Sequence, residues 1–253
     1  MRGAGRRWCC PRRHRKEISQ AGRLCSCLLI TLPPVLFRFS VLGSPGGSSH
    51  GARVHVIRDC RFAAIDFESA GAERGRTDVP VQVGLACWSV ADGHSGHFVS
   101  FLQTDRPVTW AARRVHGIGP DDLAGAPPLL GLWPEFKRRL AGAVVVAHGK
   151  GTEKRFLRAF PGHGFGPWID TLLLARAVWP ELGDHALGAL CQGHGLAAAV
   201  DALVPGRTWH DALYDSAASL VLLEYLIASF DIAERQLDLL LRPDTSAWHR
   251  LCR

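Results

Sequence analysis

The segment 62–67 constrains this chain most, because it is a nearly continuous apolar run that contains one carboxylate, Asp66, and is followed by a second, Glu68. Such a run predicts a central strand that is buried on both faces. Helices must then cover both faces of the sheet. Charges at the end of a buried strand are costly unless they are paired or bind a metal, so the two carboxylates also mark a candidate site.

The segments that follow predict an α/β fold. Residues 81–90 and 97–103, joined by the turn signal Ala91-Asp92-Gly93, should pair with 62–67 as three antiparallel strands. We then expect, in order, a helix, a short buried strand, two helices and a strand-then-helix pair at 129–140, 143–147, 152–160, 170–178, 186–194 and 211–229. This order indicates a mixed five-stranded sheet with helices on both faces.

The positive charge of the chain is concentrated in its first 52 residues. They hold nine Arg or Lys residues and one acidic residue, Glu17, a net of +8, which leaves −1 for the rest of a chain whose total is +7. The overall charge therefore says little about the part of the chain that carries the candidate site. A local basic cluster remains at Lys150, Lys154, Arg155 and Arg158, and it is either a solvated helix face or a set of phosphate contacts.

We expect residues 1–52 to be a disordered basic leader and linker, 53–230 the folded domain, and 231–253 a C-terminal helix and tail. Three interpretations of the leader stay open. It has the basic-then-apolar composition of a signal or transit sequence, but Pro33, Pro34 and Arg38 interrupt the apolar part, so no stable membrane association is expected. The Arg-rich composition, 26 Arg against 4 Lys with Met1 the only methionine, also fits a true start near Val54.

The cysteines of the domain favour a reducing compartment. Cys60, Cys87, Cys191 and Cys252 lack the close spacing of a zinc site, and we expect buried free thiols and a cytoplasmic location.

Carboxylates on three separate segments define the candidate chemistry. Asp66 and Glu68 are two residues apart on a strand, so their side chains leave the same face. Glu153 follows the buried segment 143–147, and His210 and Asp215 lie at the start of the last long helix. Oxygen ligands of this kind bind Mg²⁺ or Mn²⁺, and together the set suits metal-assisted hydrolysis of a phosphodiester. Taken alone, His210 could be a residue of the helix N-terminus, and Asp215 an exposed helix carboxylate.

The order of these residues resembles the DnaQ-like superfamily of 3′-to-5′ exonucleases, in the histidine-containing (DEDDh) branch with the proofreading epsilon subunit, ribonuclease T and oligoribonuclease. Ile65-Asp66-Phe67-Glu68 is similar to its first motif, Val146-Ala147-His148 with Phe156-Leu157 to its second, and His210 to Asp215 to its third. Val115 to Ile118, Ala126-Pro127 and Asp170-Thr171-Leu172 also match. The resemblance covers residues 61–226 and implies a ribonuclease H-like domain.

The resemblance also implies roles for the matched residues. Asp66, Glu68 and Asp215 would hold one Mg²⁺ ion, and Asp66 would bridge to a second that Glu153 supports through water; Mn²⁺ would substitute. His210 would act as the general base. His116, Gly117 and Ile118 would lie near the terminal nucleotide. The expected partners are 3′ ends of single-stranded DNA or RNA, with a polymerase as a further candidate, and the expected products are nucleoside 5′-monophosphates.

The second motif departs from the family pattern. Gly149 follows His148 where the family has asparagine, and Glu153 stands where it has aspartate. The extra methylene would disturb a direct metal ligand but not one that acts through water. The departure keeps open an alternative function, a catalytically weakened module that binds nucleic acid or a polymerase. Trp168, Trp179 and Trp209 are expected to be core or rim residues rather than base-stacking platforms.

Overall fold

A computed structural model describes residues 55–75 and 77–251 of the 253-residue chain. The expected leader and linker, 1–52, lie outside the described residues, and so does Cys252. Cys60, Cys87 and Cys191 are buried free thiols, as expected.

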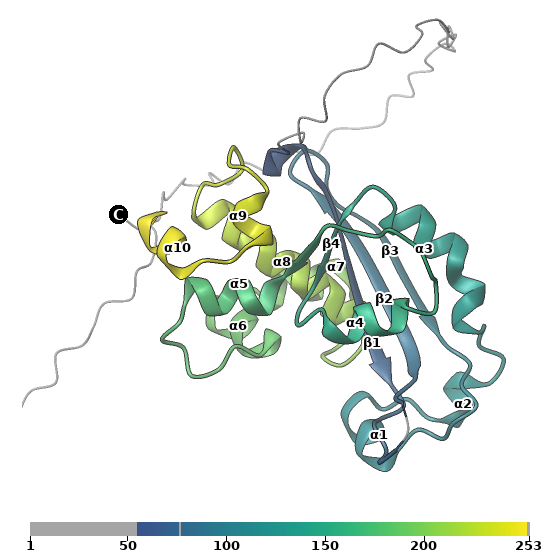
Figure 1. Cartoon of the computed structure of the whole chain (residues 1–253). Helices are drawn as coiled ribbons and strands as arrows, with labels where there is room; N and C mark the ends of the chain where they lie inside the picture. Colours follow the sequence, from purple (N-terminus) through teal and green to yellow (C-terminus); the bar gives the residue numbers. More distant parts are fainter. Residues whose placement is uncertain (1–54, 76, 252–253) are drawn as a thin grey trace, which may run out of the picture. The chain divides into compact units, whose positions relative to one another are not determined.

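The described residues contain a five-stranded mixed sheet in the order β3-β2-β1-β4-β5. The strands are β1 (Arg61–Ser69), β2 (Pro80–Ser89), β3 (Gly93–Phe101), β4 (Val144–Ala147) and β5 (Trp168–Asp170). β1 is central and pairs antiparallel with β2 and parallel with β4. β2 and β3 form the expected antiparallel hairpin, and β4 and β5 are parallel. The predicted α/β sheet is confirmed (Figure 1).

Helices cover both faces of the sheet because β1 alternates between two cores. Ala63, Ile65 and Phe67 pack with helices η2 (Leu129–Leu132), α3 (Trp133–Leu140) and α4 (Gly151–Leu157). Phe62 and Ala64 pack in the larger core on the opposite face. That core includes residues of helices α5 (Thr171–Val178), α6 (Leu187–Gly193), α7 (Ala197–Leu203), α8 (Ala212–Ser229), α9 (Asp238–Leu241) and α10 (Thr245–Leu251).

The fifth strand is not the predicted one. Most of the predicted strand 186–194 is helix α6 (Leu187–Gly193), in which Leu187, Leu190 and Cys191 have helical spacing, with the last two buried in the core. The strand beside β4 is β5, which has only three residues and ends where Asp170 caps α5. A strand of three residues is too short to show a period-two pattern in the sequence. The prediction of a strand at 186–194 is therefore wrong.

The C-terminal residues pack on the start of the domain. The amide of Ile57 donates to the carbonyl of Arg235 at 2.9 Å, and that of Leu237 donates to His55 at 2.8 Å. Trp248 of α10 is fully buried. The C-terminal segment thus packs against the residues that precede β1.

Helix α8 is long and apolar enough to cross a membrane by length and composition, but 72% of that window is buried inside the protein. It packs across β1 and β2 and is the central helix of the larger core. Its N-terminus brings the third motif to the sheet.

Candidate active site

Strand β1 presents Asp66 and Glu68 on the face that α8 covers. They alternate with Ile65 and Phe67, which are buried in the core on the other face. The expectation that both carboxylates leave the same face is therefore confirmed. Across the ladder, Asp66 lies opposite Gly84 and Glu68 lies opposite Gln82, so β2 presents these two residues to the same helix.

Gly84 lets the N-terminus of α8 lie against the sheet. A Cβ atom at this position would be 2.1 Å from the carbonyl carbon of Ala212 and 2.2 Å from the amide nitrogen of Leu213. Only a residue without a side chain allows such a backbone approach. The hydroxyl of Ser216 donates to the Gly84 carbonyl at 2.9 Å and fixes the contact.

Gln82 fixes the same helix end from inside the protein. Its side chain is 3% exposed, and its carbonyl oxygen accepts a hydrogen bond from the amide of Ala212 at 2.9 Å. Its amide nitrogen donates to Asp211 Oδ2 at 3.1 Å. Asp211 in turn caps α8 by accepting from the amides of Leu213 and Tyr214. Residues 210–215 are thus held in one position relative to β1.

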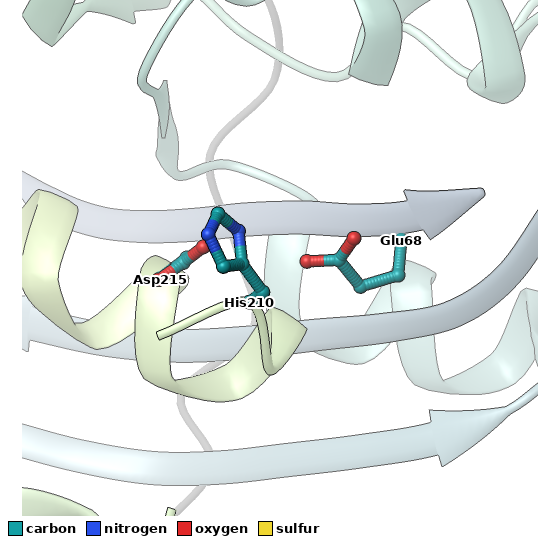
Figure 2. Close-up of side chains that lie close together, drawn as sticks. All are labelled: Glu68, His210 and Asp215. Atoms are coloured by element: carbon teal, nitrogen blue, oxygen red, sulfur yellow. The ribbon is translucent and has the colours of Figure 1, made fainter. Parts of the chain in front are cut away.

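The structure brings Glu68, His210 and Asp215 together (Figure 2). One oxygen or ring nitrogen from each residue lies within 4.8 Å of the other two, a spacing that could hold a metal ion. His210 has a φ of 66°, in the left-handed region that a non-glycine residue rarely adopts. Strained backbone of this kind is common at functional sites, where the surrounding structure fixes it.

Glu153 approaches the site from α4. Its side chain is 4% exposed, and its charge is among those that raise the pKa of Asp66. Glu153 Oε2 and Asp215 Oδ1 are buried and have no hydrogen-bond partner among the described residues. Buried carboxylate oxygens without partners are costly unless a cation or proton binds them.

The carboxylates of the site resist ionisation in the absence of a cation. Burial first, and then the charges of Asp215, Glu153 and Glu68, raise the pKa of Asp66 well above its usual range. Burial followed by the neighbouring acids raises the pKa of Glu68 to about 8. Burial also raises the pKa of Glu153 and of Asp215 to about 7, although the amide of His210 opposes the rise at Asp215. Four neighbouring acids, two of which have a buried oxygen without a described hydrogen-bond partner, are suited to bind a divalent cation that prefers oxygen ligands.

These pKa shifts predict how the metal-free protein responds to pH. Since the pKa of Asp215 is raised from 3.8 to about 7 on folding, the folded state holds this proton when the unfolded state has lost it. Ionisation therefore destabilises the fold as pH rises from about 4 to about 7. Asp215→Asn removes this effect, so the variant should exceed wild type in Tm by more at pH 8 than at about pH 5.

Thermal unfolding in EDTA at both pH values measures this difference, and histidine titrations cancel because both proteins share them. Mg²⁺ should raise the Tm of wild type more than that of Asp215→Asn, because only the wild type gains a ligand for the buried carboxylate. A difference in Tm that is the same at both pH values, with or without Mg²⁺, would contradict the assignment.

The remaining part of the second motif is structural. One ring nitrogen of His148, Nε2, lies 2.9 Å from the His185 carbonyl, and the other lies 3.0 Å from the hydroxyl of Thr171. Asp170 accepts from the amides of Gly149 and Lys150 and also caps α5. These bonds hold the turn before α4, and hence Glu153, against the end of β4.

His116 lies at the end of helix α1 (Trp110–His116), which precedes α2 (Pro120–Leu123). Its Nδ1 accepts from the amide of Ile118 at 3.0 Å, so Nε2 carries the proton and donates to the Ser69 carbonyl at 3.0 Å. Burial lowers its pKa, which favours this neutral form. His116 can therefore position groups but has no free nitrogen for proton transfer.

A cleft of about 420 Å³ lies at the start of the third motif, and its lining includes His116, Arg207, Trp209 and His210 but none of the four carboxylates. Of the five residues predicted to contact substrate, only His116 lines it. Gly117 ends α1 in a left-handed conformation, and Ile118 is buried in a small core cluster. The Lys150 amide bonds to Asp170, and the Lys154 ammonium lies 5.7 Å from the centroid of the Trp168 ring. Arg207 also lines the cleft, although the sequence does not predict it as a substrate-binding residue.

The three tryptophans considered as base platforms all make contacts within the protein, and Trp209 also lines the cleft. Trp179 is 8% exposed and stacks on His194, and Trp209 packs edge-on against Tyr214. The indole nitrogen of Trp168 donates to the Phe165 carbonyl at 3.0 Å.

A family model described as an exonuclease, RNase T, matches residues 63–223. The chain is 30% identical over 192 residues to a DNA polymerase III subunit epsilon-like protein of Rhodobacter capsulatus, covering 73% of this chain and 26% of the relative. It is 30% identical over 187 residues to a PolC-type DNA polymerase III of Halalkalibacterium halodurans, covering 72% and 12%. The chain thus spans about a quarter or less of the length of these relatives.

Two solved structures share the fold. Exonuclease X, in complex with 5′ overhanging duplex DNA, superposes with a TM-score of 0.58 at 24% identity, covering 71% of this chain and 99% of that one. The nuclease domain of 3′hExo, a DEDDh family member bound to rAMP, gives a TM-score of 0.55 at 14% identity, covering 70% and 95%. These neighbours agree with the predicted ribonuclease H-like fold.

Proposed function

Because the chain belongs to the RNase T family of exonucleases, we propose that it is a metal-dependent 3′-to-5′ exonuclease that degrades single-stranded or frayed nucleic acid to nucleoside 5′-monophosphates. The observation that carries this proposal is the convergence of Asp66, Glu68, Glu153 and Asp215 beside His210, with two buried carboxylate oxygens unpartnered. A structural acid cluster would pair such oxygens with donors or cations of its own.

The four carboxylates would hold two Mg²⁺ ions, for which Mn²⁺ can substitute. When bound, the ions would neutralise these carboxylates and stabilise negative charge on the phosphate. The cleft at His116 and Arg207 is of a size suited to one nucleotide, and we place the 3′-terminal nucleotide there. Arg207 already pairs with Asp211 at 2.5 Å, so its guanidinium is held beside the start of the third motif.

His210 is the proposed general base. It would accept a proton from a water molecule as the water oxygen bonds to phosphorus and the bond from phosphorus to the 3′ oxygen breaks. The 5′-monophosphate leaves, and the new 3′ hydroxyl takes its proton from solvent. The exposed side chain of His210 can then release its own proton to water.

Hydrolysis of end-labelled strands tests the proposal. The full chain with Mg²⁺ or Mn²⁺ should shorten 5′-labelled single-stranded DNA or RNA stepwise from the 3′ end, and chromatography should identify 5′-monophosphates. Shortening from the 5′ end, or products with 3′-phosphates, would refute the assigned polarity. Binding without hydrolysis would instead support the weakened module that the altered second motif suggests. The same assay compares DNA with RNA.

Glu153 offers a sharper prediction, because it stands where relatives are expected to have aspartate. Glu153→Asp should keep kcat/KM within about tenfold of wild type, since a water-mediated contact tolerates a shorter side chain. Glu153→Ala should lose about 10- to 100-fold, the cost of removing a supporting partner of a metal site. The loss should also appear as a higher Mg²⁺ requirement.

Kinetics against Mg²⁺ and Mn²⁺ concentration measure both variants. Glu181→Ala, which removes an exposed carboxylate from a loop, is the matched control and should match wild type. Full activity of Glu153→Ala would show that this carboxylate has no part in metal binding.

A further inference from the structure

Helix α1 presents an aromatic and basic surface that neither the fold nor the proposed chemistry uses. None of its residues is buried, and Trp110 is 72% exposed, the highest value among the large hydrophobic residues that the structure describes as exposed. The guanidinium carbon of Arg114 lies 4.7 Å from the centroid of the Trp110 ring. Val115 on the same helix is 54% exposed. Burial of a tryptophan side chain is strongly stabilising, because the side chain has a large apolar surface. A tryptophan that stays exposed on a surface helix therefore indicates a binding site for an external ligand.

The helix is anchored to the site at both ends. The amide of Thr109, which caps α1, donates to the Ala70 carbonyl at 2.8 Å, and His116 at the other end donates to Ser69 at 3.0 Å. Ser69 is the last residue of β1 and Ala70 follows it, so both acceptors come directly after Glu68 in the sequence. Figure 1 shows α1 beyond the end of the β1 arrow. Gly71 permits this docking, because a Cβ there would be 2.2 Å from Thr109 Oγ1.

The two ends of α1 lie at different distances from the cleft. His116 lines the cleft beside His210, whereas Trp110 lies six residues earlier, about 9 Å away along the helix axis at 1.5 Å per residue. A strand whose last nucleotide occupies the cleft would meet Trp110 one or two nucleotides upstream. The helix carries Arg113 and Arg114 and no acidic residue, which suits an anionic phosphate backbone better than an apolar protein surface.

We propose that Trp110 and Arg114 form an upstream subsite for single-stranded nucleic acid, in which the indole stacks on a base and the guanidinium contacts a phosphate. This inference rests on the proposed function and adds a determinant of affinity for strands longer than one nucleotide. Arginine over an aromatic ring beside a basic helix is a combination that binds bases without regard to sequence. The subsite shares no residue with the four carboxylates, so binding to it can be tested apart from hydrolysis.

Binding and hydrolysis of substrates of two lengths test the subsite in the full chain. Fluorescence anisotropy with a labelled oligothymidylate of roughly 12 nucleotides gives Kd, with every protein carrying Asp66→Asn so that the strand is not cut. Trp110→Ala should weaken binding by about fivefold or more, the loss expected for one stacked base. Trp110→Phe should recover most of it. Arg114→Gln should weaken binding less at high salt than at low salt.

The minimal substrate is the p-nitrophenyl ester of thymidine 5′-monophosphate, which would fill the cleft beside His116 without reaching Trp110 at the other end of α1. With Asp66 intact, Trp110→Ala should leave its hydrolysis unchanged while raising KM for the long strand. Leu130→Ala, which shortens a residue that is 61% exposed on η2, is the control and should change neither. Long-strand binding by Trp110→Ala that equals wild type, or equal losses on both substrates, would overturn the subsite. If the wild type neither binds the strand nor cleaves either substrate, the proposed function itself fails.

Discussion

Asp66→Asn is expected to reduce hydrolysis by at least about a thousandfold, or ~4 kcal/mol of transition-state stabilisation, while the domain remains folded. Asp66 is the carboxylate whose pKa responds to the charges of all three of the other acids, Asp215, Glu153 and Glu68. It is thus the one group placed to interact with every ligand of a two-ion site. Asparagine keeps its shape and removes its charge.

The loss should appear in kcat/KM on 5′-labelled strands at saturating Mg²⁺, with folding followed by circular dichroism and Tm. In EDTA the variant should be at least as stable as wild type, because repulsion among the acids is relieved. Asp59→Asn is the matched control, since Asp59 is an exposed aspartate before the opposite end of β1. Retention of more than about a tenth of wild-type activity would contradict a site in which Asp66 contacts both ions.

The parts of the fold that the sequence predicts well are those with long, strong patterns. β1 and α8 are apolar over most of their length, and they carry Asp66 and Glu68 in β1 and Asp215 in the first turn of α8. The prediction of the short elements is wrong because their patterns are short and ambiguous. β5 has only three residues, and α6 offers an apolar run that fits either a strand or a helix.

The sequence does not predict which residues position the site, because their roles depend on contacts between distant segments. Gln82 is a polar residue in an apolar strand, and its two hydrogen bonds depend on a helix 130 residues away. Trp110 could not be distinguished from a core aromatic, because exposure depends on how α1 packs. The contact between α8 and β2 does leave a signal in the sequence, because an isolated glycine within a strand indicates a close backbone approach, and Gly84 is such a glycine.

Gly84→Ala is expected to disrupt both stability and catalysis. Its new Cβ would lie 2.1 Å from the carbonyl carbon and 2.2 Å from the carbonyl oxygen of Ala212, so backbone on one side must move. Overpacking of this kind costs about 1–3 kcal/mol of folding free energy. Because Ala212 begins the helix that carries Asp215, the shift would also separate that carboxylate and His210 from β1. A displacement of about 1 Å in a catalytic group can lower the rate about 100-fold.

Two measurements separate these effects. Chemical denaturation gives the change in free energy of unfolding, and kcat/KM measured well below Tm gives the change in catalysis of the protein that remains folded. Gly193→Ala is the matched control, because Gly193 lies in helix α6 and, apart from its chain neighbours and its own helix, no described atom lies within 4 Å of an added Cβ. That variant should keep wild-type activity and lose no stability, since alanine is the better helix former. If Gly84→Ala were as active as wild type, the position of α8 against β2 would not set the geometry of the third motif, and Gln82 and Ser216 would serve stability alone.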